Sequence, residues 1–108
     1  MPDLTSLLSP IDTPERCGLI INDEIVELDN VHPEPTRGFH MNPAQLVEHV
    51  AQATATWHTH PGSDPALSEE DYEGFCQWPN LVHHIVGVRK GEPSVETYKV
   101  VDRMVVKL

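Results

Sequence analysis

The chain has 108 residues, enough for one compact domain over residues 1–108 and too few for two. Its acidic residues outnumber the basic ones 17 to 7, and the formal net charge of −10 repels nucleic-acid phosphates and anionic lipid head groups. No apolar stretch reaches the roughly 20 residues that span a bilayer, and the first residues lack the basic start and apolar run of a secretory signal. We therefore expect a cytoplasmic protein that binds neither nucleic acid nor membranes.

The first half of the chain is predicted to contain two strands and one clear helix. Residues 4–9 lie between prolines, so any helix there must be short. Two runs rich in Leu, Ile and Val, at 17–22 and 24–31, predict a hairpin that turns at Asn22 and Asp23. Asn42 is a good N-cap and Pro43 suits the first helical position, which predicts a helix that ends near residue 53.

The second half is predicted to add a strand, a second helix and three more strands. β-Branched and aromatic residues predict a strand at 54–60, and Gly and Pro residues predict a loop at 61–67. Ser68 opens a capping box with Asp71, so a helix should run to about residue 77. Apolar runs predict strands at 81–89, 94–101 and 103–108, with a turn at 90–93. The predicted fold class is α/β, a single domain with a mixed β-sheet flanked by helices.

Two cysteines, Cys17 and Cys76, do not make a disulfide framework, and each lies among apolar residues. We expect both to be small buried side chains in a reducing compartment. Seven histidines is a high count for this length. Ordinary polar or packing roles, rather than metal binding, are expected for five of them: His32, His40, His49, His83 and His84.

The other two histidines are candidate metal ligands. His58 and His60 are two residues apart on the predicted strand at 54–60, so their side chains leave the same face. Asp71 follows in the first turn of the next helix, and a third ligand there would leave the fourth position of a tetrahedral zinc open, as in catalytic sites. Taken one at a time, the histidines could be surface residues, Ser68 a simple helix cap, and Asp71 an acid near the helix dipole.

The combined pattern is more specific than its parts. The run HTHP at 58–61, followed by Ser68 and Asp71, resembles the JAMM (MPN-plus) metalloprotease family, whose signature is an upstream Glu, then HxHP, a short loop and SxxD. The segment PERCGL at 14–19 matches the upstream part and supplies Glu15.

The resemblance implies the JAMM/MPN (cytidine-deaminase-like) fold, with Zn²⁺ held by His58, His60 and Asp71. It also implies that Glu15 is the general base and that Ser68 stabilises the oxyanion. Glu69 and Glu70 are interpreted as surface acids that point elsewhere.

The function that the resemblance implies is zinc-dependent hydrolysis of a peptide or isopeptide bond in a protein or peptide substrate. The segments LDN at 28–30 and FHMNP at 39–43, with Trp57 and Trp78, resemble the subset found in tail-assembly proteins of phages and related bacterial proteins. That setting implies phage tail components as partners and association with the virion. An alternative is C-terminal processing of a ubiquitin-like sulfur carrier protein, which suits the short chain.

Two non-catalytic alternatives also stay open. An MPN-type scaffold is one, although relatives of that kind typically lose ligands that this chain retains. A purely structural zinc domain is the other, and it would need a fourth protein ligand from a residue distant in the sequence.

Overall fold

The computed structural model describes residues 2–108, with six strands, two α-helices and two short 3-10 turns. In chain order these are η1 (Thr5–Leu7), β1 (Cys17–Ile21), β2 (Glu24–Leu28), α1 (Pro43–His49), η2 (Val50–Gln52), β3 (Ala55–Thr59), α2 (Glu69–Cys76), β4 (Val82–Arg89), β5 (Glu92–Val101) and β6 (Met104–Lys107). Within the described range, no helix has the length and apolar character needed to cross a membrane.

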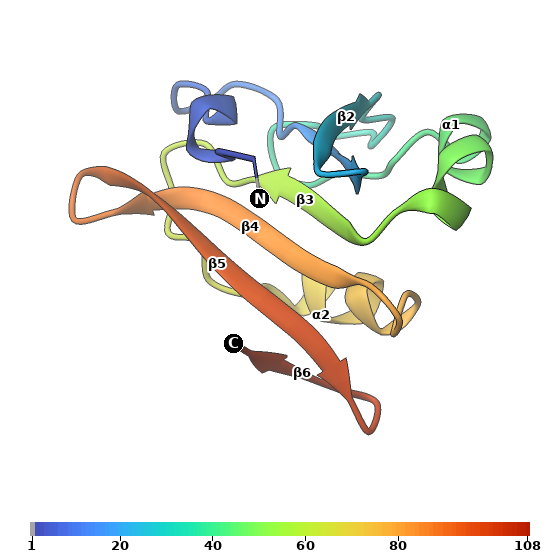
Figure 1. The fold of residues 1–108 in the computed structure, drawn as a ribbon. Coiled ribbons are helices and arrows are strands. Elements are labelled where there is room, and N and C mark those ends of the chain that lie inside the picture. The colour runs from blue at the N-terminus through green and yellow to red at the C-terminus, as the bar shows by residue number, and fades with distance from the viewer. Residues whose placement is uncertain (1) are drawn as a thin grey trace.

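The six strands form one mixed sheet in the order β2-β1-β3-β4-β5-β6 (Figure 1). Neighbouring strands are antiparallel except for β3 and β4, which run parallel and are joined through α2. Because a connection between parallel strands must run back along the sheet, α2 begins beside the end of β3. The predicted fold class, α/β with a mixed sheet flanked by helices, is confirmed.

Each face of the sheet has its own hydrophobic core. The face toward the N-terminal segment carries a cluster of buried side chains: Leu4, Ile20, Ala55, Trp57 and Val86. On the other face, Phe75 of α2 packs with Ile85 and Tyr98, and Leu46 of α1 packs against a cluster that includes Leu19. Both helices therefore cover the same face, which is the face that also receives His58.

Helix α1 begins as the sequence predicts and ends earlier. The Asn42 side chain accepts hydrogen bonds from the N–H groups of Ala44 and Gln45 at 3.0 and 3.2 Å, and Pro43 fills the first position. The α-helix stops at His49, and the chain continues to Gln52 as a 3-10 turn. The helix was predicted to end near residue 53, which is correct only if α1 and the 3-10 turn η2 are taken together.

Two strand boundaries differ from the predictions by more than one residue. Strand β2 ends at Leu28 instead of residue 31, and Asn30 forms an isolated bridge with Met41. The turn after β4 holds only Lys90 and Gly91, both with positive φ, so residues 92 and 93 belong to β5. Proline is tolerated there because β6 pairs only with residues 98–101 of β5 and leaves this end as an edge.

The two cysteines are free thiols. Cys17 is buried in β1, and its thiol contacts the Leu28 carbonyl oxygen at 3.7 Å. Burial raises the pKa of Cys17 to about 12, so this thiol stays protonated at neutral pH. Cys76 is only half-buried, so the expectation of two buried cysteines is correct for one of them.

His83 is a buried polar residue on the helix-covered face. Its Nε2–H donates to the Trp78 carbonyl oxygen at 3.1 Å, which leaves Nδ1 to accept a hydrogen bond from the Thr56 hydroxyl at 2.7 Å. The ring stacks on Phe75 with centroids 4.2 Å apart. Burial lowers the pKa of His83 to about 4.

We expect His83 to make the protein less stable in mild acid. Its pKa in the unfolded chain is about 6.5, so below that pH the unfolded state binds the proton more readily, and the free energy of unfolding falls until about pH 4. The slope from this one group is at most about 1.4 kcal/mol per pH unit. Urea unfolding at several pH values in this window measures it. His83→Asn, which keeps an acceptor for Thr56, should give a shallower slope, and an unchanged slope would contradict the assignment.

Candidate metal centre

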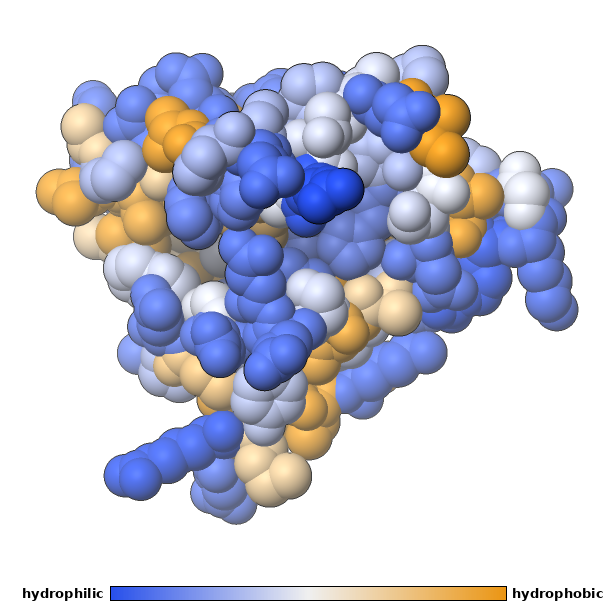
Figure 2. Space-filling model, turned by 180° about the vertical axis from the view of Figure 1, so that it is seen from behind, coloured by the Kyte–Doolittle hydropathy of each residue, from blue (hydrophilic) through white to orange (hydrophobic). Residues whose placement is uncertain are grey.

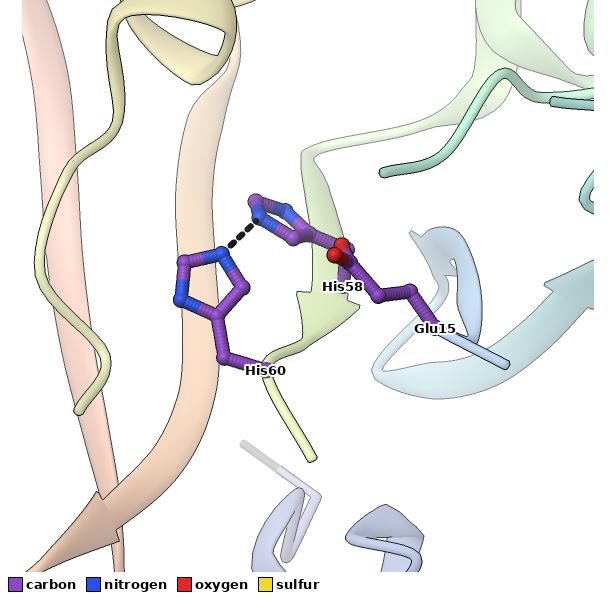
Figure 3. Close-up of side chains that lie close together, drawn as sticks. All are labelled: Glu15, His58 and His60. Atoms are coloured by element: carbon purple, nitrogen blue, oxygen red, sulfur yellow. Dashed lines mark hydrogen bonds between the residues drawn. The ribbon is translucent and has the colours of Figure 1, made fainter. Parts of the chain in front are cut away.

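The predicted ligands meet at the edge of the sheet where β3 ends. His58 lies on β3, on the face that the helices cover, and is fully buried. The strand stops at Thr59, so His60 lies just beyond its end. The prediction that His60 lies within the strand is therefore wrong by one residue. The His60 N–H still donates to the Val86 carbonyl oxygen at 2.7 Å, which keeps the chain alongside β4. The two imidazoles consequently point toward one another (Figure 3).

The loop at 61–67 returns the chain to this edge by packing closely on β4. The Val88 N–H donates to the Ser63 carbonyl oxygen at 2.7 Å, and the Tyr98 hydroxyl donates to the Pro65 carbonyl oxygen at 3.1 Å. Gly87 permits this approach, because a Cβ there would lie 2.4 Å from the Ser63 oxygen. As a result, the start of α2 lies next to the two histidines.

Asp71 is oriented by the predicted capping box. The Ser68 hydroxyl oxygen accepts a hydrogen bond from the Asp71 N–H at 3.0 Å, and Asp71 Oδ2 accepts one from the Ser68 N–H at 3.3 Å. These two bonds fix the carboxylate in the first turn of α2, where only 6% of the side chain is exposed. The cap that stabilises the helix therefore also aims Asp71 at the histidines.

The three predicted ligands are spaced as metal ligands are. The Nε2 atoms of His58 and His60 are 3.1 Å apart. Asp71 Oδ1 lies 3.1 Å from His58 Nε2, and Oδ2 lies 3.2 Å from His60 Nε2. Bonds of about 2.0–2.1 Å to a tetrahedral zinc would place two ligand atoms about 3.3 Å apart. The observed separations fit such an ion after small shifts.

The hydrogen bonding of His60 provides a test of whether a cation belongs here. Its Nδ1 lies 3.1 Å from the Asp64 carbonyl oxygen, and since a carbonyl can only accept, Nδ1 must carry the proton. In the neutral ring Nε2 is then unprotonated, and its lone pair faces the Asp71 carboxylate. Two acceptors at this distance need a proton or a cation between them, and a ring nitrogen that donates to a carbonyl is the usual support of a metal-binding histidine. Two imidazoles and one carboxylate are ligand types that bind zinc, so the side chains present fit this ion.

The same conflict appears in the charges of the centre. Burial is the largest single effect on His60 and lowers its pKa, but the hydrogen bonds with Asp71 and Asp64 and the charges of Asp71 and Glu15 together outweigh burial and raise this pKa. Burial alone raises the pKa of Asp71, but its contacts with His58 and His60 outweigh burial and lower this pKa. Both pKa shifts mean that a positive charge beside the Asp71 carboxylate is favourable.

His58 is held by packing. Phe39 stacks on its ring with centroids 4.2 Å apart, and Phe75 lies at 6.0 Å on a tilted plane. Its Nδ1 has no hydrogen-bond partner among the described residues. Burial lowers the pKa of His58, which favours the neutral imidazole that binds metals.

Glu15 lies in the segment that leads into β1, and its backbone is held from two sides. Its N–H donates to the Pro35 carbonyl oxygen at 2.7 Å, and its carbonyl oxygen accepts from the Asn30 side chain at 2.9 Å. The next residue, Arg16, exchanges two 2.9 Å hydrogen bonds with Thr59 at the end of β3. These bonds place Glu15 beside the centre.

The Glu15 carboxylate reaches the two imidazoles (Figure 3). One of its oxygens and one ring nitrogen each of His58 and His60 lie within 4.8 Å of one another. Burial raises the pKa of Glu15 to about 7. A hollow of about 250 Å³ is lined by Glu15, His60, Ser68 and Asp71, so the structure brings these predicted residues together around one space. It is the candidate active site and is called the active-site hollow below.

This arrangement is matched by a known family. The chain matches the prokaryotic homologs of the JAB domain over residues 11–101, which include every residue of the centre. It belongs to this family. The resemblance to JAMM (MPN-plus) proteins that the motif indicates is confirmed at the level of the JAB family. No curated protein matches the chain.

Two solved structures share the JAB-domain fold of this chain. The solution structure of a protein from Desulfitobacterium hafniense is 22% identical, with a TM-score of 0.67, and the match covers 88% of this chain and 75% of that one. The solution structure of a protein from Salinibacter ruber is 18% identical, with a TM-score of 0.56, covering 90% and 76%. At these identities the likeness shows the fold alone.

Sequence reasoning missed Asn30 as a support of this JAB domain. Its amide nitrogen donates to the Glu15 and Gly38 carbonyl oxygens at 2.9 and 3.0 Å, and its amide oxygen accepts from the N–H groups of His32 and His40 at 3.0 and 3.1 Å. One side chain thus ties the loop between β2 and α1 to the candidate base. Asn30 belongs to the LDN segment that the sequence singled out, but its hydrogen bonds to Glu15 and to the loop can be recognised only in the structure.

Glu70 is a surface acid as predicted, with 56% of its side chain exposed, but the prediction that it points elsewhere is wrong. Its Oε1 lies 3.3 Å from His32 Nε2 and 3.7 Å from His40 Nε2, and it borders the active-site hollow. These three side chains lie close enough to hold a cation. However, His32 Nδ1 accepts the Glu34 N–H at 2.8 Å, so in the neutral ring the proton sits on Nε2 and is directed at Glu70. The group is explained by hydrogen bonding without a metal.

Proposed function

We propose that this JAB domain is a zinc-dependent hydrolase of peptide or isopeptide bonds. The observation that carries the proposal is the geometry of His60: its Nδ1 donates to the Asp64 carbonyl oxygen, so in the neutral ring the lone pair of Nε2 faces His58 and the Asp71 carboxylate. Glu15, a buried acid without a structural ion pair among the described residues, lies beside that point. A structural role would not require such an acid next to the ligands.

The ligand set of two imidazoles and one carboxylate suits a catalytic zinc site with one open position. Zinc held there would polarise the groups it binds and would lower the pKa of water from 15.7 to about 7. Phe39 and Phe75 exclude solvent from the His58 side of the centre, while the His60 side opens into the active-site hollow. Substrate would therefore approach from the hollow.

Glu15 would act as the general base. Its carboxylate accepts a proton from the attacking water as the water oxygen bonds to the scissile carbonyl carbon. It then passes that proton to the leaving nitrogen when the C–N bond breaks. The backbone of Glu15 makes hydrogen bonds with Asn30 and Pro35, and these hold its carboxylate at the edge of the active-site hollow. From there it can reach both the water and the leaving group.

Ser68 would stabilise the negative charge that develops on the scissile carbonyl oxygen. Its oxygen accepts the Asp71 N–H, so the cap does not use the hydroxyl proton. That proton can be donated into the active-site hollow, which Ser68 lines. Donors placed in this way stabilise the transition state more than the substrate.

Metal analysis together with a cleavage assay tests the proposal. We expect close to one zinc per chain in freshly purified protein, and cleavage of some members of a mixed peptide pool that is followed by mass spectrometry. His58→Ala should lose both zinc and cleavage, because a two-ligand site holds zinc poorly. His49→Ala, a histidine on α1 outside the centre, is the matched control and should retain both. Protein that takes up no zinc would contradict the metal site, and zinc without cleavage would favour a scaffold.

A further inference from the structure

A second hollow adjoins the metal centre on the same face of the sheet. It has a volume of about 430 Å³ and lies between α1 and α2, with Thr56 and His83 of the sheet beneath it. Asp71 lines both hollows, so the second one, the apolar hollow, borders the centre. Figure 2 views the molecule from behind the sheet of Figure 1, and hydrophobic side chains gather in this view on the left and in the lower centre.

Gly74 keeps the apolar hollow open. It lies inside α2 without a positive φ, and a Cβ at this position would meet nothing within 4 Å. Neither packing nor backbone conformation therefore requires glycine, which destabilises a helix interior by roughly 0.5–1 kcal/mol relative to alanine. What glycine provides here is space, because Gly74 lines the hollow.

The walls and floor of the hollow suit an aromatic ring. Phe39, Phe75 and Trp78 line it, and Met41 adds a thioether, which contacts rings favourably. The polar floor is already satisfied, since both nitrogens of His83 are hydrogen-bonded, to Thr56 and to the Trp78 carbonyl. A polar occupant would find few free partners at the floor, whereas a ring loses nothing there.

The rim of the hollow carries negative charge. Glu70 and Glu73 line it beside Asp71, and the whole chain has a net charge of −10. This charge attracts a cationic group next to the buried ring. We propose that the apolar hollow binds an aromatic side chain of a polypeptide substrate, with Lys or Arg as its neighbour. The proposal rests on the hydrolase function for its biological meaning, but binding can be tested without cleavage.

The test is peptide binding to the full chain carrying Glu15→Gln, in which bound peptide should stay intact. The probe is acetyl-Ala-Phe-Lys-Ala-amide, and the readout is the indole N–H resonance of Trp78 in an NMR titration. Trp57 is the internal reference, because its fully buried indole donates to the Leu19 carbonyl oxygen on the other face of the sheet. We expect a saturable shift of Trp78 alone. The peptide with Ala in place of Phe should bind at least about 10-fold more weakly.

Gly74→Phe should fill the hollow, with Gly74→Leu as a second variant that favours the helix. Both should bind the Phe peptide no better than the Ala peptide, without a lower melting temperature. Val47→Phe adds the same ring to α1 at a side chain that is 78% exposed and should leave the preference for Phe unchanged. Equal affinity for the two peptides, or full binding by both Gly74 variants, would overturn the proposal. Binding without cleavage by the unmodified chain contradicts only the hydrolase function, and cleavage without a Trp78 response contradicts only this inference.

Discussion

Glu15→Gln is expected to lower the turnover of peptide substrate by about 10²–10⁴-fold while zinc content and melting temperature stay close to those of the unmodified chain. The side chain keeps its shape, and the hydrogen bonds that position residue 15 are made by its backbone with Asn30 and Pro35. Only the ability to accept a proton from water is lost. Turnover, elemental analysis and thermal unfolding of the same preparation measure the three quantities.

Glu69→Gln provides a matched control for this substitution. Glu69 is an exposed acid in the first turn of α2, so the variant removes the same charge close to the centre without touching the active-site hollow. We expect a change in turnover of less than about threefold, since an exposed charge near solvent has a small effect. Loss of zinc in Glu15→Gln would show that Glu15 is a ligand, and an equal loss of turnover in both variants would reduce Glu15 to a source of negative charge.

The element order and the meeting of the candidate ligands could be read from the sequence because local chemistry determines them. Asn42 and Ser68 are helix caps whose residue type predicts their place, and the structure has both. The spacing of His58 and His60 predicted a common direction, which the structure shows although His60 lies past the end of β3. The strand boundaries were less accurate because they depend on pairing partners distant in the sequence.

What the sequence could not supply are the contacts across the loop between β2 and α1. Asn30 joins this loop to Glu15, and Phe39 of the same loop stacks on His58. His32 and His40 have no informative spacing in the chain and meet Glu70 only because the loop folds over the start of α2. Contacts of this kind follow from tertiary packing and leave no periodic signal.

These contacts also change what the resemblance to phage tail-assembly proteins means. Two residues of the segments that suggested this resemblance support the candidate site: Asn30 contacts the candidate base, and Phe39 contacts a candidate ligand. Trp57, from the same set, fills the core on the other face of the sheet. Their structural roles explain their presence without reference to a substrate. Phage tail components and a ubiquitin-like carrier protein thus both stay proposals, and the apolar hollow is a more direct source of substrate preference.

Ser68→Asp is expected to fold with near-native stability and to lose about 10²–10³-fold in kcat. As a helix cap, aspartate accepts the Asp71 N–H as well as serine does and suits the positive end of the helix dipole. As an oxyanion partner it fails, because a carboxylate cannot donate a hydrogen bond and its charge repels the developing negative charge. Ser68→Ala, which loses the cap as well, should be about 1 kcal/mol less stable and similarly inactive.

Ser68→Asn separates the donor from the cap at nearly the same size as aspartate. Its amide oxygen can cap the Asp71 N–H, while its amide N–H can donate toward the active-site hollow. We therefore expect the asparagine variant to turn over substrate faster than the aspartate variant at equal melting temperature and zinc content. If instead Ser68→Asp is stable and fully active, the hydroxyl proton has no catalytic role, and Ser68 acts through Asp71 alone by fixing the carboxylate that faces His58 and His60.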